Sequence, residues 1–212
     1  MTFQQVAVTG LGVMAPQGAD PQEMFEALMR AESAVQPVHP ELPKAAAAAT
    51  VAFDASRWFT KLQLAGVDRV SQLAVAAADM AMRDAGSPAD VDPERIGVFS
   101  GCGMGGAAAL EAAYRGNGRV SPLTIPAFMP NAPAAHVAMR QGAQGPVLTY
   151  SVACASSSAA IAEAAKAVQR LGRTHAQVVE RIAPDGGQRI PLDRIADARG
   201  RAMRIAVADV AR

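Results

Sequence analysis

The chain has 212 residues, half of them hydrophobic, and a formal net charge of +1 at pH 7. This length allows one domain, or one domain with an appendage, to bury a substantial core, and the near-zero charge with few aromatic residues argues against nucleic acid or an anionic membrane as a partner. Two cysteines without a CxxC pair, no signal-peptide pattern and no long apolar run predict a soluble, cytoplasmic protein without disulfides or a metal site.

The first third of the chain opens with a short buried strand at residues 6–8, closed by a glycine-containing turn. A helix then begins with Asp20 as its N-cap and Pro21 at its first helical position. From residue 34 to 60 prolines and an alanine run break the pattern. This region predicts a surface excursion with one strand near residues 51–53.

Strands and helices alternate in the rest of the chain. A helix at residues 70–85 is followed by a strand at 96–99, a glycine-rich loop at 100–106 and an alanine-rich helix. The next clear strand, at residues 146–153, leads into a further helix. Repeated strand, crossover helix and strand predict an α/β fold with a largely parallel sheet covered on both faces. Active groups are then expected at the carboxyl ends of the strands.

Cys154 stands where that last strand gives way to the helix-prone residues 155–164. The unpaired amide donors and the positive dipole end of a helix favour thiolate over thiol, and thiolate is the attacking species. Cys154 is therefore a candidate nucleophile. The alternative is a small buried apolar residue, which is what most free cysteines are, and the local pattern leaves both open.

Three glycines in the loop at 100–106 match the GxGxxG spacing of dinucleotide-binding loops: Gly101, Gly103 and Gly106. That fingerprint expects an acidic residue roughly 20 positions further on to bind a ribose hydroxyl. The corresponding stretch, residues 121–128, has two prolines and no acidic residue. We therefore favour the interpretation that the glycines allow close approach of the backbone to another segment.

The histidines give weak signals. His136 lies in a short helix-like piece before Cys154, and a Cys/His hydrolase would need its imidazole within about 3 Å of the sulfur. A lone histidine among alanines is more often a packed structural residue. His39, between prolines, and His175, near the end of the chain, have weaker claims.

Four motifs, in order along the chain, resemble the N-terminal half of a β-ketoacyl-acyl carrier protein synthase, an elongating condensing enzyme of the thiolase fold. They are VAVTGLGVMAP at 6–16, RIGVFSGCGMGG at 95–106, MPNAPAAHVA at 129–138, and GAQGP at 142–146 with SVACASSS at 151–158. The resemblance implies an α/β fold that is a thiolase-like N-terminal half, with a mostly parallel mixed sheet covered by helices.

The resemblance also implies a chemistry. Cys154 becomes the nucleophile that accepts an acyl group, and its amide N–H becomes a donor to the thioester oxyanion. His136 becomes structural, and the glycine loop becomes a packing element near the site. In complete members the acyl-enzyme then condenses with a decarboxylating malonyl carrier protein, in fatty acid or polyketide synthesis. The substrates travel on the phosphopantetheine of acyl carrier protein, and no cofactor or metal is implied.

The sequence departs from the family in its last part. Two histidines and a lysine that assist decarboxylation in the family have no matching motif here, and the resemblance ends at Leu171. We divide the chain into a β-ketoacyl synthase N-terminal domain at residues 1–171, a partial fold, and an Arg/Ala-rich, non-matching tail at 172–212. The tail could form a loose amphipathic helix, and it could equally be a frame-shifted or fused segment.

These departures shape the expected function. We expect a truncated synthase-like protein with little condensing activity alone, forming a homodimer or associating with another ketosynthase. The alternative is a noncatalytic subunit or remnant that binds a complete ketosynthase through residues 147–165, and a Cys/His hydrolase is a distant third. Docking of acyl carrier protein through residues 61–69 is doubtful, because only Lys61 and Arg69 are basic there.

Overall fold

The computed structural model describes seven stretches of the chain: residues 6–38, 43–44, 46–86, 91–116, 118–171, 175–180 and 202–207. Five strands form one sheet in the order β1-β7-β6-β4-β5, in which all the described pairings are parallel. Two further strands, β2 and β3, form a separate antiparallel pair. The strands are Ala7–Val8 (β1), Val35–Val38 (β2), Ala46–Ala49 (β3), Ile96–Gly101 (β4), Val147–Tyr150 (β5), His175–Glu180 (β6) and Ala202–Val207 (β7).

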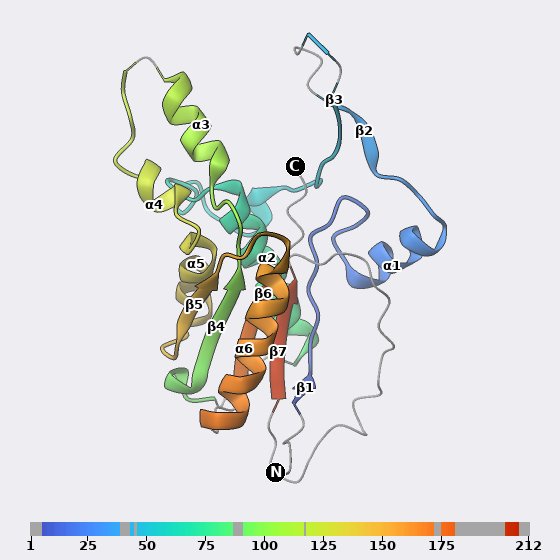
Figure 1. Cartoon of the computed structure of the whole chain (residues 1–212), viewed down its shortest axis with the longest axis vertical. Helices are drawn as coiled ribbons and strands as arrows, with labels where there is room; N and C mark the ends of the chain where they lie inside the picture. Colours follow the sequence, from blue (N-terminus) through green and yellow to red (C-terminus); the bar gives the residue numbers. More distant parts are fainter. Residues whose placement is uncertain are drawn as a thin grey trace.

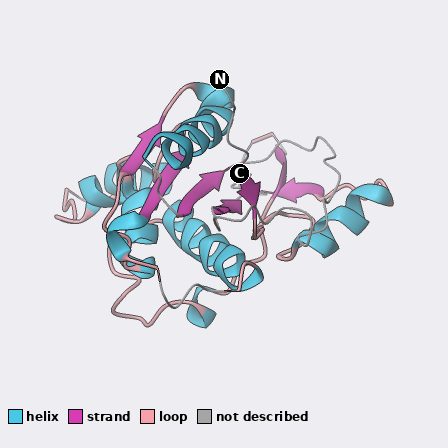
Figure 2. Ribbon diagram, turned by 90° about the horizontal axis from the view of Figure 1, so that it is seen from below, coloured by secondary structure: helices cyan, strands magenta, loops and turns pink. Residues whose placement is uncertain are grey.

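Helices cover both faces of the five-stranded sheet (Figures 1 and 2). Helix α6 lies on one face, and α2 and α5 lie on the other (Figure 1). The α-helices are Pro21–Met29 (α1), Arg69–Asp84 (α2), Ala107–Arg115 (α3), Thr124–Phe128 (α4), Ala132–Gln141 (α5) and Ser156–Leu171 (α6), with 3₁₀ turns at Ala55–Arg57 (η1), Pro93–Arg95 (η2) and Ala153–Ala155 (η3). The predicted α/β fold with a parallel sheet between helical layers is confirmed.

Strand β4 joins two hydrophobic cores because its side chains alternate between the faces of the sheet. Val98 is buried in the core formed with α2 and α5. Phe99 is buried on the other face, in the core formed with α6. A strand buried on both faces reads as a continuous apolar run, which is why the sequence signal for β4 was strong.

The helix starts follow the capping signals in the sequence. Asp20 caps α1 by accepting hydrogen bonds from the amides of Gln22 at 2.7 Å and Glu23 at 3.4 Å. Asp68 caps α2 in the same way, through the amide of Val70 at 3.1 Å. Each cap satisfies amides that the helix itself leaves unpaired.

One predicted strand is wrong. Residues 51–53 have no regular structure, and the strand of this region is β3, which lies in the alanine run just before them. The small alanines pair with β2, from Ala49 opposite Val35 to Ala46 opposite Val38. Val51 instead turns inward to the α2 core, and its carbonyl accepts a hydrogen bond from Arg69 at 2.6 Å.

The described parts of the tail are strands rather than the loose helix that the sequence left open. Strand β6 pairs with β4, and β7 pairs with β6 and β1. Pairing on both sides satisfies the backbone hydrogen-bonding groups of β6 and β7, and such tertiary context overrides a weak local helical pattern. Residues 181–201 and 208–212 lie outside the described residues.

The loop after β1 approaches α2 so closely that side chains are excluded. A methyl group at Gly12 would clash with the carbonyl oxygen of Ala77 and would lie 2.6 Å from the amide nitrogen of Ala81. Ala77 and Ala81 are themselves fully buried. Backbone atoms cannot move away cheaply, so this contact fixes the distance between β1 and α2.

We therefore predict that Gly12→Ala lowers the free energy of unfolding by about 2 kcal/mol or more, because the added methyl group overpacks the contact with α2. The measurement is urea unfolding followed by circular dichroism. Gly103→Ala is the matched control, because a methyl group at Gly103 meets nothing within 4 Å. Equal unfolding midpoints for the two variants would contradict the described contact.

Candidate active site around Cys154

Cys154 lies at a sharp turn between β5 and α6. The strand ends at Tyr150, the 3₁₀ turn η3 covers Ala153–Ala155, and the 16-residue helix α6 begins at Ser156. Ala153 has a φ of 49°, a left-handed conformation that is uncommon for a residue with a side chain. Cys154 is exposed at this turn. The predicted setting of the cysteine, between a strand and a helix, is confirmed.

The glycine loop that follows β4 lies against this turn. The amide of Cys102 donates to the carbonyl of Tyr150 at 3.0 Å, and the hydroxyl of Ser151 donates to the carbonyl of Gly103 at 3.4 Å. Because β4 and β5 are parallel neighbours, their carboxyl ends bring both loops to the same edge of the sheet.

Two glycines of this loop are required for close packing. A methyl group at Gly101 would lie 2.5 Å from the amide nitrogen of Ser157 and 2.6 Å from the carbonyl carbon of Ser156. One at Gly106 would lie 2.8 Å from the side chain of Asp68 and would clash with the backbone of α4. Gly103 has open space around it. The interpretation of this loop as a packing element is confirmed at Gly101 and Gly106.

The second cysteine differs from Cys154 in its environment. Cys102 is buried in the glycine loop. Burial raises the pKa of the Cys102 thiol, and hydrogen bonds from the backbone of Gly105 and Met104 oppose this effect in part. A raised pKa leaves less thiolate at neutral pH, so Cys102 is a poor nucleophile.

Neither of the two histidines within the described residues, His136 and His175, is placed beside Cys154. His136 belongs to α5, on the opposite face of the sheet from α6, and the described residues contain no hydrogen bond between it and Cys154. Partial burial lowers the pKa of His136, which therefore stays neutral at pH 7. His175 is opposite Ile96 at the start of β4, at the end of the sheet away from the carboxyl ends of its strands. His39 lies outside the described residues.

One of the two basic residues in the doubtful docking stretch makes contacts with a neighbouring segment of the fold. The guanidinium of Arg69 donates to the carbonyl of Val51 and lies 5.8 Å from the centre of the Phe53 ring. Lys61 is exposed. Arg69 is also exposed, but its hydrogen bond to Val51 ties it to the segment before η1.

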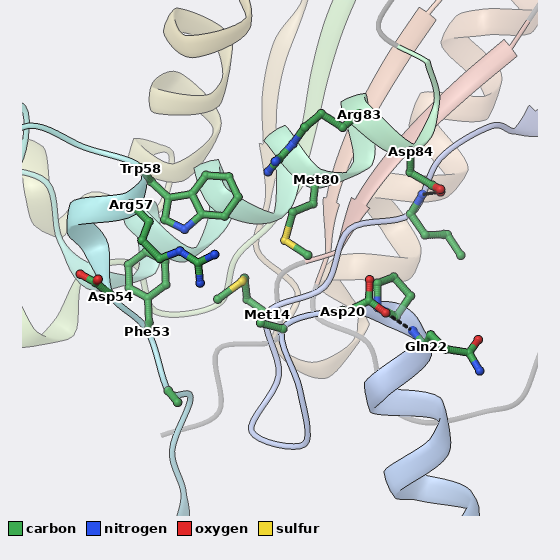
Figure 3. Close-up of a pocket in the computed structure, with 14 residues that line it drawn as sticks. Met14, Asp20, Gln22, Phe53, Asp54, Arg57, Trp58, Met80, Arg83 and Asp84 are labelled. Atoms are coloured by element: carbon green, nitrogen blue, oxygen red, sulfur yellow. Dashed lines mark hydrogen bonds between the residues drawn. The ribbon is translucent and has the colours of Figure 1, made fainter.

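A pocket of about 590 Å³ lies away from Cys154, between the start of α1, η1 and the end of α2 (Figure 3). Its wall is fixed by Arg83, whose guanidinium lies 5.0 Å from the centre of the Trp58 ring. Asp84, at the other side of the pocket, accepts a hydrogen bond from the amide of Leu11 at 2.8 Å. None of the lining residues belongs to the turn around Cys154. Sequence reasoning missed this pocket, because its walls come from segments far apart in the chain.

The described residues provide neither a candidate metal site nor a helix that could cross a membrane. No cluster of three or more His, Cys, Asp or Glu side chains in that part of the chain could hold a metal ion. None of the helices described there is both long enough and apolar enough to cross a bilayer.

Comparison with known proteins identifies the family. Residues 3–179 match the family model of the β-ketoacyl synthase N-terminal domain, so the chain belongs to the β-ketoacyl synthase family. The match includes Cys154 and extends past Leu171 into β6.

Curated relatives support this assignment. The chain is 34% identical to nodulation protein E of Rhizobium meliloti over 217 residues, which is 99% of this chain and 52% of that protein. It is 30% identical to 3-oxoacyl-[acyl-carrier-protein] synthase 2 of Staphylococcus aureus (strain N315) over 209 residues, which is 92% of this chain and 48% of that protein. The chain therefore spans about half the length of the curated relatives that it matches.

Solved structures show the same fold. A β-ketoacyl synthase from Burkholderia phymatum STM815 superposes with a TM-score of 0.68 at 26% identity, covering 80% of this chain and 44% of that one. The ishigamide ketosynthase/chain length factor gives a TM-score of 0.71 at 22% identity, covering 81% of this chain and 45% of that one. The predicted ketosynthase, thiolase-like fold class is confirmed.

The different environments of the two cysteines give a prediction. At pH 7 iodoacetamide should label Cys154 at least about ten times faster than Cys102, because Cys154 is exposed whereas Cys102 is buried. Burial shields the Cys102 thiol from the reagent and also raises its pKa. Each unit by which the pKa rises lowers the thiolate fraction about tenfold. Mass spectrometry of tryptic peptides over time gives both rates. Labelling of Cys102 at the same rate as Cys154 would show that the Cys154 thiol is not selectively reactive.

Proposed function

We propose that Cys154 is the acyl-accepting nucleophile of a ketosynthase-like protein in fatty acid or polyketide synthesis. The observation that carries this proposal is the exposed thiol at the β5–α6 turn, in a chain of the β-ketoacyl synthase family. The position of Cys154 at the carboxyl edge of a parallel sheet further supports the proposal, because ligands of open α/β sheets bind at that edge.

The proposed step is a thioester exchange. The Sγ thiolate of Cys154 attacks the carbonyl carbon of an acyl thioester carried on the phosphopantetheine of acyl carrier protein. A new C–S bond forms to Cys154, the bond to the carrier sulfur breaks, and the released carrier thiolate takes up a proton. The amide N–H of Cys154 donates to the oxyanion that develops during this attack. The thioester brings its own activation, so this step uses no metal or organic cofactor.

The named relatives support the substrate class. One of them is a 3-oxoacyl-[acyl-carrier-protein] synthase, and one solved structure is a type II polyketide ketosynthase in complex with its acyl-carrier protein. We extend this partner to the present chain as part of the proposal. The stretch at residues 61–69 contributes little to docking, because Lys61 and Arg69 are its only basic residues and Arg69 is bound to the carbonyl of Val51.

We propose further that this chain alone does not complete condensation. Decarboxylation of a malonyl thioester builds an enolate that needs hydrogen-bond donors at its oxygen, and loss of one such donor typically costs about 2.7 to 4 kcal/mol. His136 lies across the sheet from α6, and His175 is at the far end of the sheet from Cys154. Neither is placed to supply this donor.

The proposal predicts a covalent adduct. Incubation with an acyl-acyl carrier protein should add one acyl group to the chain, because the exposed thiol can exchange with the carrier thioester. Intact-protein mass spectrometry measures the added mass, and peptide mapping locates it. Cys154→Ala should abolish the adduct, and Cys102→Ala should leave it unchanged. An adduct on another residue, or none with folded protein, would remove Cys154 as the acceptor.

The same mixture supplied with malonyl carrier protein should release no 3-oxoacyl product above background. Product that is lost in Cys154→Ala and retained in His136→Ala would contradict the second part of the proposal. It would leave the acceptor role of Cys154 intact.

A second function is favoured by the edge of the sheet. Strand β5 is at the end of the described five-stranded order, and its Val147 and Leu148 are 40% and 45% exposed. An unpaired edge with apolar side chains is a template for another strand. We propose that β5 pairs with a second ketosynthase-type chain, most simply another copy of this one. A solved ketosynthase from Xenorhabdus doucetiae in complex with its chain length factor is a related fold that assembles with a partner.

Association through β5 predicts that Leu148→Lys shifts the protein toward monomer, because a charge on the edge strand opposes pairing. Sedimentation velocity at micromolar concentration measures the distribution of species. The control is Leu62→Lys, since Leu62 is also exposed and lies far from β5 in the sequence. A monomeric wild-type chain, or equal association in both variants, would argue against pairing through β5.

A further inference from the structure

The hydroxyl of Ser156 spans the turn that presents Cys154. Its oxygen accepts a hydrogen bond from the amide of Val152 at 2.9 Å and donates one to the carbonyl of Ala153 at 2.7 Å. One side chain from the first residue of α6 thus binds the backbone on both sides of the Val152–Ala153 peptide link. Ser156 is only 4% exposed, so water does not compete easily for these two bonds.

The bridged residue is the one whose backbone is strained. Ala153 has a φ of 49°, where the left-handed conformation crowds its Cβ. Such a conformation persists only when the surroundings hold it in place. On the β5 side the amide of Val152 is held by Ser156, and on the α6 side the carbonyl of Ala153 is held by the same hydroxyl. The next residue is Cys154, so the conformation of Ala153 sets the direction of its thiol.

Ser156 is also fixed from the opposite direction. The end of β4 packs directly on it, since a methyl group at Gly101 would lie 2.6 Å from its carbonyl carbon. The serine therefore cannot move closer to the sheet without displacing β4. Because the Ser156 hydroxyl binds the turn that bears Cys154, the position of this turn depends on the position of the end of β4.

We propose that Ser156 is a positioning residue for Cys154, whose hydroxyl holds the strained turn so that the thiol faces outward at the start of α6. The inference rests on the proposed acyl-accepting role of Cys154 and adds a residue to that site. Ser156 does not touch the substrate. It acts on the rate at which Cys154 reacts, by keeping the sulfur and the amide of Cys154 in one fixed geometry toward the thioester.

Ser156→Ala removes the hydroxyl, and Ser158→Ala is the matched control, because it makes the same change two residues further along α6, at an exposed residue. Three quantities are measured: hydrogen exchange of the Val152 amide, alkylation of Cys154 and Cys102 by iodoacetamide, and acylation of Cys154 at a series of acyl-acyl carrier protein concentrations. Ser156→Thr, which keeps a hydroxyl, tests for rescue.

In Ser156→Ala the saturating rate of acylation at Cys154 should fall by about 10- to 100-fold, the cost of a misplaced reacting group, and alkylation of Cys154 should also slow. The carrier concentration at half-saturation should stay the same, because the carrier-binding surface is unchanged. Alkylation of Cys102 should not change, protection of the Val152 amide should be lost, and Ser156→Thr should recover at least part of the rate. Ser158→Ala should stay within about twofold of wild type on the same scale.

The outcomes separate this inference from the proposed function. If wild-type Cys154 accepts no acyl group but Ser156→Ala still slows alkylation of Cys154 alone, the acyl-acceptor role fails and the positioning role stands. If acylation proceeds at the wild-type rate in folded Ser156→Ala, the positioning role fails and the acyl-acceptor role stands. If Ser156→Ala does not fold, hydrogen exchange of the wild-type protein is the test. Rapid exchange of the Val152 amide would overturn the proposed role of its hydrogen bond to Ser156.

Discussion

Strand β4 pairs with β5 on one side and with β6 on the other, so both rows of its backbone hydrogen-bonding groups are used within the sheet. Its side chains are buried on both faces, with Val98 among α2 and α5 and Phe99 against α6. A slip by one residue would turn Val98 and Phe99 to the opposite cores, which are packed around side chains of different size, so the register of β4 is fixed. Both helical layers are therefore positioned relative to β4.

The position of the candidate site follows from that strand. Gly101 ends β4, and the absence of a side chain there lets the start of α6 pack directly on the sheet. The turn that carries Cys154 is thus placed at a distance set by backbone contact rather than by a flexible side chain. An exposed thiol on so rigid a support loses little entropy when it meets a substrate, which is the arrangement that nucleophilic catalysis favours.

The sequence predicted those elements whose formation depends on residues close together in the chain. The cap at Asp20, the helix at residues 70–85, the apolar run of β4 and the strand-to-helix setting of Cys154 all depend on neighbouring residues in the chain. The bridge by Ser156 is also short-range, but its recognition requires the φ angle of Ala153. An alanine in the sequence does not indicate that its φ angle is positive.

Long-range contacts could not be predicted in this way. Asp79 and Arg83 stand four residues apart on α2, yet the carboxylate of Asp79 pairs with Arg140 of α5 at 2.8 Å. Arg83 turns its guanidinium toward Trp58 instead. Strands β6 and β7 likewise depend on pairing with β4 and β1, which no local pattern encodes. The pocket beside α1 and η1 arises from the same kind of distant contact.

The surface around Cys154 links the proposed chemistry to the proposed association. Met104 and Val152, from the two loops that meet at the turn, are exposed together with the thiol. A long acyl chain on Cys154 would lie against this apolar rim, and burying its methylenes would contribute about 0.8 kcal/mol each. An exposed rim covers an acyl chain from one side only, and the pocket beside α1 and η1 does not include it. Full burial requires a second surface over the turn. The exposed edge of β5, directly before it, is where a partner chain would bring one.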